Sequence, residues 1–190
     1  MNHLIQRKNP VSSAWIALLL LFLCSNTLFA QSHKIALSLT GGVVQDGFGG
    51  MITGDYKVNE FDYLQFNLQA SYATFEQNNI DIPVDTYSFN AGFFFDILRN
   101  NSRTFALSLG AGGTVGYETI NNDDPNIDIN QILNVETNTI VYGAYAGLDA
   151  DLFVSPVVAI NIKLNETYHF NSEIGEFTLY AGLGIKLIIK

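Results

Sequence analysis

The sequence predicts an all-β protein: an eight-stranded antiparallel up-and-down transmembrane β-barrel that follows a cleaved signal peptide. Three observations lead to this fold class. The 190-residue chain opens with a short basic segment followed by an apolar one. The remainder alternates apolar and polar residues with period two, which is typical of strands with one apolar face. Finally, 14% of residues are charged and 13% aromatic, a composition that excludes a disordered acidic chain.

Residues 1–30 have the pattern of a secretory signal peptide. Arg7 and Lys8 precede an apolar run from Ala14 to Cys24, and the small residue Ala30 precedes a polar stretch. The run is shorter than the roughly 20 residues that a spanning helix needs, which favours a cleaved signal over an anchor. Cleavage after Ala30 would leave a barrel domain of residues 31–190. This domain lacks cysteine, which excludes disulfides and thiol catalysis within it.

Eight segments carry the alternation. It is clearest in residues 62–73, where Leu64, Phe66 and Leu68 share one parity and polar residues occupy the other. Because successive side chains of a strand point to opposite faces, each segment has one apolar and one polar face. No helical periodicity is found after Ala30. The segments are 34–43, 50–58 (the weakest), 62–73, 86–97, 104–118, 140–153, 158–170 and 177–187.

The expected connectors alternate in length. One set comprises 44–49, 75–85, 119–139 and 171–176, and the other comprises 59–61, 98–103 and 154–156. Longer loops on one rim and short turns on the other are typical of outer-membrane barrels, whose short turns are periplasmic. We therefore expect the first set at the outer end and the second at the periplasmic end.

Aromatic residues cluster at both predicted strand ends on the apolar parity. Such positions form the girdles of a membrane barrel, where aromatic rings lie at the headgroup level. A soluble lipocalin-like barrel is the alternative, but its outward parity should be rich in Lys and Glu, whereas here the polar parity is mainly Gly, Ser, Thr, Asn and Gln. The expected girdle at the long-loop end is Tyr72, Tyr87, Tyr117, Tyr142, Tyr168 and Phe177, and the expected girdle at the periplasmic end is Tyr56, Phe95 and Phe105.

The polar parity predicts a filled lumen, because an eight-stranded barrel is just wide enough for its own side chains. Asp149, Asp151, Lys163 and Lys186 share this parity on three consecutive segments. Buried charges need partners, so we expect an internal salt-bridge cluster and a plugged barrel rather than a general pore. Glu166 falls among the apolar positions. Either it lies above the hydrocarbon band or a bulge turns it, and the sequence leaves both open.

The sequence predicts no catalytic residue, no cofactor and no metal site. His169, followed by Ser172 and Glu173, is a weak hint of a barrel hydrolase, but no nucleophile motif accompanies it. Nine basic residues and a net charge of −9 leave no basic stripe for nucleic acid. We also expect no small-molecule substrate.

Four segments, in order, resemble one family. They are GGVVQDGF (41–48), RTFALSLGAGGTVGYETIN (103–121), YGAYAGLDADLFVSPVVAINIK (142–163) and YAGLGIKLIIK (180–190). Together they are similar to the TraO family of conjugal-transfer proteins from Bacteroidetes-type conjugative transposons. The resemblance implies a non-catalytic outer-membrane component of a transfer apparatus of the type IV secretion kind. Its partners would be the lipid bilayer and other apparatus proteins. The alternative is a stand-alone OmpA/OmpX-like barrel for adhesion or envelope integrity.

The connector 119–139 is the longest and carries a candidate partner loop. It contains acidic residues and no basic one, among Ile127, Ile129 and Leu133. Acidic charge can orient a protein partner while apolar side chains are buried against it. A surface loop without a partner explains the same residues equally well. The partner-loop residues are Asp123, Asp124, Asp128, Ile132 and Glu136.

Overall fold

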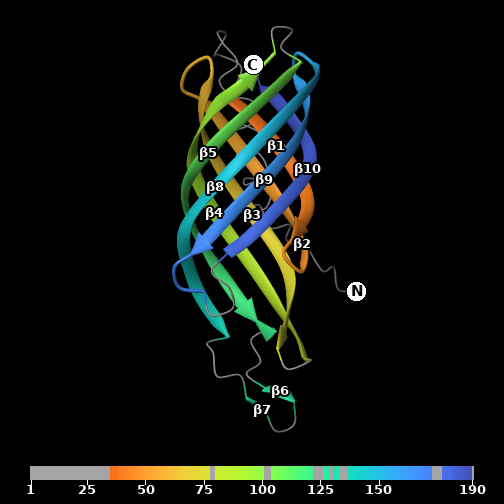
Figure 1. Cartoon of the computed structure of the whole chain (residues 1–190), viewed down its shortest axis with the longest axis vertical. Coiled ribbons are helices and arrows are strands. Elements are labelled where there is room, and N and C mark those ends of the chain that lie inside the picture. The colour runs from red at the N-terminus through yellow and green to blue at the C-terminus, as the bar shows by residue number, and fades with distance from the viewer. Residues whose placement is uncertain are drawn as a thin grey trace, which may run out of the picture. The chain divides into compact units, whose positions relative to one another are not determined.

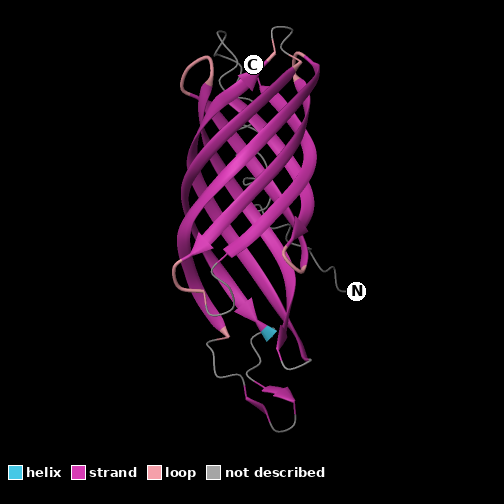
Figure 2. Cartoon of the chain, in the orientation of Figure 1, coloured by secondary structure: helices cyan, strands magenta, loops and turns pink. Residues whose placement is uncertain are grey.

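Eight strands of the computed structural model close into one antiparallel barrel, in the order β1-β10-β9-β8-β5-β4-β3-β2 (Figure 1). The structure describes residues 35–77, 80–100, 104–121, 126–128, 131–132, 137–172 and 177–189. Almost all of this part is strand (Figure 2). The barrel strands are β1 (Ile35–Val44), β2 (Gly47–Lys57), β3 (Asp62–Gln77), β4 (Ile80–Arg99), β5 (Phe105–Ile120), β8 (Asn138–Ser155), β9 (Val158–His169) and β10 (Phe177–Ile189).

The predicted eight-stranded antiparallel barrel is confirmed. Each barrel strand pairs with the next barrel strand along the chain, and β1 pairs with β10 from Ile35↔Ile189 to Val44↔Tyr180. Within the described residues, no helix is long and apolar enough to cross a membrane. The predicted signal peptide, residues 1–30, lies outside the described residues.

The alternation places polar side chains inside and apolar ones outside. On β9, Asn161, Lys163 and Asn165 are buried in the lumen, whereas Ile160 and Ile162 are exposed. This distribution is the reverse of a water-soluble barrel, whose apolar residues fill the interior. It follows directly from the period-two pattern of the sequence.

The first outer connector is shorter than predicted. Residues 44–49 were expected to form a loop, but β1 continues to Val44 and β2 starts at Gly47. Gln45 and Asp46 alone make the turn, in which Asp46 takes a left-handed φ of 57°, a conformation that Asp tolerates better than most residues. A Cβ at Gly47 would lie 2.0 Å from the carbonyl oxygen of Tyr72, so the close strand contact at this position requires glycine.

The second outer connector, predicted as 75–85, is also largely strand. β3 runs to Gln77 and β4 begins at Ile80, and the two pair along this whole length. The pairing of β4 with β5 begins at Val84, so Pro83 has a strand neighbour on one side only. Proline is tolerated at such an edge because no ladder hydrogen bond needs its missing N–H. The predicted connector 75–85 is therefore wrong over most of its length.

The two remaining outer connectors are long. Between β5 and β8, the short strands β6 (Asn126–Asp128) and β7 (Gln131–Ile132) pair in a sheet of their own. They lie beyond the barrel, at the end where β5 stops and β8 starts (Figure 1). β9 ends at His169 and β10 starts at Phe177.

The turns of the other rim are short, as predicted, and side chains close them. Asn59 Oδ1 accepts hydrogen bonds from the backbone N–H groups of Phe61 and Asp62, at 2.8 and 2.7 Å. Asn100 Oδ1 accepts from the backbone N–H groups of Thr104 and Phe105. Such side-chain caps satisfy backbone donors where the sheet ladder ends.

Large and small residues interdigitate in the lumen. Tyr63, Phe94 and Tyr145 form one buried cluster, with the rings of Tyr63 and Phe94 stacked at 5.5 Å. Gly110 makes room for this cluster, because a Cβ there would lie 2.3 Å from two ring carbons of Phe94. A second cluster contains Val44, Met51 and Tyr180.

Candidate functional site

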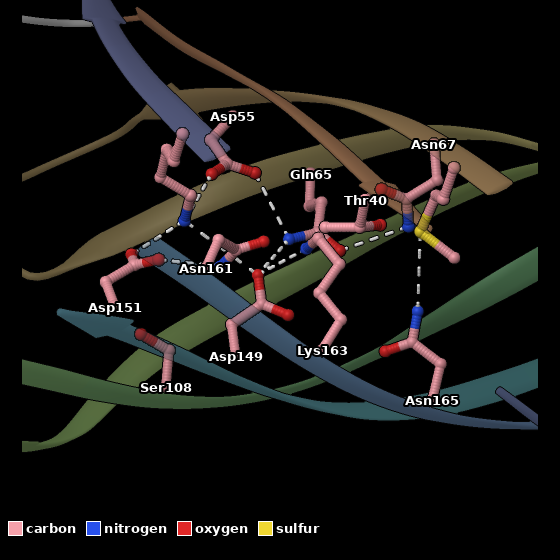
Figure 3. A network of polar contacts seen from close by, with 12 residues as sticks. Thr40, Asp55, Gln65, Asn67, Ser108, Asp149, Asp151, Asn161, Lys163 and Asn165 are labelled. Carbon is pink, nitrogen blue, oxygen red and sulfur yellow. Dashed lines mark hydrogen bonds and ion pairs between the residues drawn. The ribbon is translucent and has the colours of Figure 1, made fainter. Parts of the chain in front are cut away.

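The lumen holds a buried charge network, which we define as Asp55, Asp149, Asp151, Lys163 and Lys186 (Figure 3). Lys163 Nζ lies 2.5 Å from Asp149 Oδ2, and both side chains are inaccessible to solvent. Lys186 Nζ lies 2.7 Å from Asp151 Oδ2 and 3.0 Å from Asp55 Oδ2. The structure therefore brings together the four residues that the sequence singled out.

Register explains how these residues meet. Asp149 on β8 is directly opposite Lys163 on β9. Lys186 comes from β10, and Asp55 comes from β2, which is separated from β10 by β1. The Lys186–Asp55 contact thus passes across the seam where the barrel closes.

The sequence argument missed Asp55, Gln65 and Asn161. Gln65 Nε2 donates to Asp149 Oδ2 at 2.8 Å and to Asp55 Oδ1 at 3.1 Å. Asn161 Nδ2 donates to Asp151 Oδ1 at 2.6 Å. All three missed residues occupy the polar parity of their strands, which was the available signal. Their lateral proximity depends on the stagger of the closed barrel, which the parity does not contain.

The charge network fits a structural role. It contains three carboxylates and two ammonium groups, and the amides of Gln65 and Asn161 donate to the carboxylates. Such additional donors are what a buried ion pair needs to offset its desolvation. The hydrogen bond from Gln65 on β3 to Asp149 on β8 spans the lumen, so the network ties opposite walls together.

A second ion pair lies near the short-turn rim. Arg99 contacts Asp96, which also accepts a 2.6 Å hydrogen bond from the Ser108 hydroxyl. The guanidinium carbon of Arg99 lies 5.9 Å from the centre of the Phe61 ring, in the range of a cation–π contact. This group fixes the turn between β2 and β3 against the end of β4.

His169 does not form the arrangement that a hydrolase would need. Its imidazole is buried, and among the described residues neither ring nitrogen has a hydrogen-bond partner. The Ser172 hydroxyl instead lies 3.2 Å from both carboxylate oxygens of Glu118. An activated serine requires a hydrogen bond to its base, and that bond is not made here. Glu173 lies outside the described residues.

The predicted girdle residues point outward. Tyr72, Tyr87, Tyr117, Tyr142 and Phe177 are exposed at the long-loop end, and Tyr56 and Phe95 at the other end. Tyr168 is half-buried because the rings of Phe170 and Phe177 lie 5.4 and 4.8 Å from its own. Phe105 is also half-buried. Their role as membrane girdles stays a prediction.

Glu166 faces outward on β9. It pairs with Ala146 of β8 and Leu179 of β10, and no register shift occurs near it. Of the two alternatives, the bulge is therefore wrong. The position is two residues before Tyr168, close to the long-loop end of the strand.

Part of the predicted partner loop is described. Asp128 lies on β6 and Ile132 on β7, the two strands of the small hairpin. Asp123, Asp124 and Glu136 lie outside the described residues. The loop as a partner site remains a prediction.

An apolar wall, a polar and filled lumen and eight antiparallel strands define a small β-barrel of the outer-membrane type. Solved structures agree with this fold. The barrel is similar to Neisserial surface protein A, with a TM-score of 0.52, 13% identity, and coverage of 82% of this chain and 96% of that one. A major outer membrane protein from Thermus thermophilus gives a TM-score of 0.59 at 10% identity, with coverage of 82% and 98%. The N-terminal β-barrel domain of Pseudomonas aeruginosa OprF gives a TM-score of 0.51 at 11% identity, with coverage of 82% of this chain and 96% of that one.

The sequence identifies the particular family. The chain belongs to the TraO family, because the family model described as conjugative transposon protein TraO matches residues 34–189. The predicted resemblance is thus confirmed over the whole barrel. No curated protein matches the chain.

Proposed function

We propose that this protein is a non-catalytic outer-membrane component of the transfer apparatus of a conjugative transposon. In this proposal, residues 1–30 direct export, the barrel anchors the protein in the outer membrane, and its rims and loops contact other apparatus proteins. The observation that carries the proposal is an apolar-walled barrel with a polar, filled lumen in a chain of the TraO family.

The outer wall supports the membrane placement. Large apolar side chains cover it, and residues such as Leu39 and Ile140 expose 64% and 66% of their surface. Soluble monomers rarely expose contiguous apolar patches larger than a few hundred Å². A bilayer covers such a wall and also suits the aromatic residues at both strand ends.

The lumen supports an anchoring role over transport or catalysis. The charge network and the Tyr63–Phe94–Tyr145 cluster fill it, and side chains in such a packed interior hold the strands rather than a substrate. Among the described residues, Ser172 is hydrogen-bonded to Glu118 and not to His169, which also disfavours the hydrolase hypothesis.

The distribution of charge supports protein partners at the long-loop end. Among the described residues, the Lys and Arg side chains outside the lumen are Lys57 and Arg99, and both belong to the short-turn end. The connector between β5 and β8 contains Asp123, Asp124, Asp128 and Glu136 and no basic residue. An acidic rim attracts a basic protein surface and repels DNA, so contact with protein is the expected use of this end.

A transfer assay tests the proposal. Deleting the gene should abolish or strongly reduce conjugative transfer, and plasmid-borne wild-type protein should restore it. Replacing residues 122–136 by a short Gly-Ser linker should leave the barrel assembled and transfer reduced. Normal transfer by the deletion strain would contradict the proposal and favour a stand-alone barrel.

A matched pair of charge variants locates the contact. Asp123→Lys with Asp124→Lys reverses two charges in the connector after β5, and Glu173→Lys with Glu176→Lys makes the same change in the connector before β10. If the longer loop binds the partner, the first pair lowers transfer and the second does not. Equal effects would indicate a general electrostatic contribution of the rim instead.

A further inference from the structure

The outer wall carries a groove of about 830 Å³ over β2 to β5, reaching β1 and β8. This volume lies within the roughly 300–1,000 Å³ typical of ligand sites. Its lining includes Leu39, Ile52 and Leu68, which are outward-facing and exposed. The groove is therefore on the lipid side of the wall, separate from the lumen and its charge network.

A row of small residues between two rows of large ones creates the depression. In the strand register, Gly41, Gly50 and Ala70 lie side by side across β1, β2 and β3. On one side of them is the row Leu39, Ile52 and Leu68, and on the other the row Val43, Phe48 and Tyr72. With little or no side chain in the middle row, the backbone forms the floor of a trough. Gly50, Ala70 and the row Leu39, Ile52 and Leu68 line the groove itself, whereas Gly41 and the row Val43, Phe48 and Tyr72 continue the trough beyond that lining.

Beyond Ala70, the positions of the middle row are occupied by tyrosines, and the trough ends there. Ala70 pairs with Tyr87, which pairs with Tyr117, and both tyrosines line the groove. The Tyr87 hydroxyl lies 3.2 Å from that of Tyr72. The groove thus combines an apolar trough with phenol hydroxyls at the end of the barrel that carries the long loops.

The width of the trough restricts its occupant. The two large rows are four residues apart along each strand, about 13 Å between backbones before their side chains narrow the gap. An α-helix with its side chains is about 10–12 Å across and is too wide to reach the floor. A single hydrocarbon chain is narrow enough, and a lipid has the same order of apolar and polar parts as the groove.

We propose that this groove is a specific binding site for an acyl chain of an outer-leaflet lipid. The chain lies over Gly41, Gly50 and Ala70, and the Tyr72, Tyr87 and Tyr117 hydroxyls face the headgroup region. The site rests on the proposed membrane placement, since it needs lipid at the wall. It adds that one stretch of the wall holds a lipid in place, while the rest contacts exchanging lipid.

Glycine positions provide variants that fill the trough without straining the barrel. A Cβ at Gly41 would meet nothing within 4 Å, and one at Gly50 would lie 3.7 Å from the Thr40 carbonyl oxygen, an ordinary contact. Gly54, also outward on β2 but outside both the small-residue row and the groove lining, is the matched control, because its Cβ would meet only Leu37 Cδ2, at 3.7 Å.

The test uses the protein in lipid nanodiscs containing a trace of phospholipid with a diazirine on one acyl chain. After irradiation, mass spectrometry of peptides maps the labelled residues. Parent and Gly54→Leu should show labelling concentrated on the groove residues of β2 to β4. Gly41→Leu and Gly50→Leu should reduce that labelling several-fold while labelling elsewhere on the wall is unchanged.

Three results would overturn the site. They are even labelling around the wall of the parent, groove labelling unaffected by Gly50→Leu, and a groove protected from label because a second copy covers it, seen as a dimer by native mass spectrometry. Failure of the membrane placement is distinguishable. In that case the parent would not enter nanodiscs or show a heat-dependent gel shift, whatever residue occupies position 50.

Discussion

Replacing Lys186 by Met should strongly destabilise the barrel. The ammonium group is buried and contacts Asp151 at 2.7 Å and Asp55 at 3.0 Å. The substitution keeps a long apolar side chain of similar length but leaves two buried carboxylates without their cation. Removing one partner of a buried pair costs about 3–5 kcal/mol. With a urea dependence of about 1–3 kcal/mol per M, the unfolding midpoint should fall by roughly 1–5 M.

Two further variants separate charge from packing. Lys163→Met should lower the free energy of unfolding less than Lys186→Met does. Asp149 keeps the hydrogen bond from Gln65 at 2.8 Å and still has Lys186 Nζ at 4.0 Å. Adding Asp55→Asn and Asp151→Asn to Lys186→Met should recover most of the loss. Both new amides can still accept hydrogen bonds from Gln65 and Asn161, and no unpaired charge remains.

The assay is urea unfolding in detergent micelles, followed by far-UV circular dichroism and by the gel mobility of unboiled samples. Lys57→Met is the control, since its ammonium group donates a 3.5 Å hydrogen bond to the Glu60 carbonyl oxygen at an exposed turn. An unchanged midpoint for Lys186→Met would refute the reasoning. So would a triple variant no more stable than Lys186→Met.

Three other predictions follow from the geometry. Unboiled protein should migrate differently from boiled protein and begin at Gln31, and its recovery from the soluble periplasm without such a shift would exclude the membrane barrel. Gly110→Ala should lower stability by about 1–3 kcal/mol because the new methyl group overlaps the Phe94 ring. Gly113→Ala, whose Cβ meets only a carbonyl oxygen at 3.8 Å, should be neutral in the same urea titration. Glu166→Gln should leave the midpoint within about 0.5 kcal/mol, because charges near the membrane interface cost little, and a large loss would reveal a contact made by this carboxylate.

The strands could be predicted because each carries its own signal. On β3 from Leu64 to Tyr72, and on β9 from Ile160 to Asn165, the apolar and polar residues alternate without a break, so parity alone defines the two faces. Strand ends were harder. Gly47 and Gly49 indicate a turn in the sequence, but in the barrel they allow β2 and β3 to approach closely. Pro83 indicates a loop, but it lies on an edge segment where proline is acceptable.

The charge network was predictable only in part. Parity places Asp149, Asp151, Lys163 and Lys186 inside, and β8, β9 and β10 are neighbours both in sequence and in space. Asp55 and Gln65 come from β2 and β3, which approach these strands only when the barrel closes. Their contacts depend on the stagger between first and last strands, a property of the closed sheet rather than of any segment.

The selection of a single strand register explains why charged residues occupy a lumen that apolar residues could fill. Both faces of a barrel strand can be covered, one by lipid and one by the lumen, so apolar packing alone discriminates weakly between registers. A slip of one residue would turn every side chain of a strand to the opposite face. For β10, that slip would expose Lys186 to lipid and place Ile185 or Leu187 among the carboxylates. Lys186 contacts Asp55 of β2 and Asp151 of β8, so a one-residue shift of β10 relative to either strand would break an ion pair. Replacing the network by neutral residues should therefore affect the uniqueness of barrel closure more than its stability, and the triple variant should refold with a lower yield of the single heat-modifiable species.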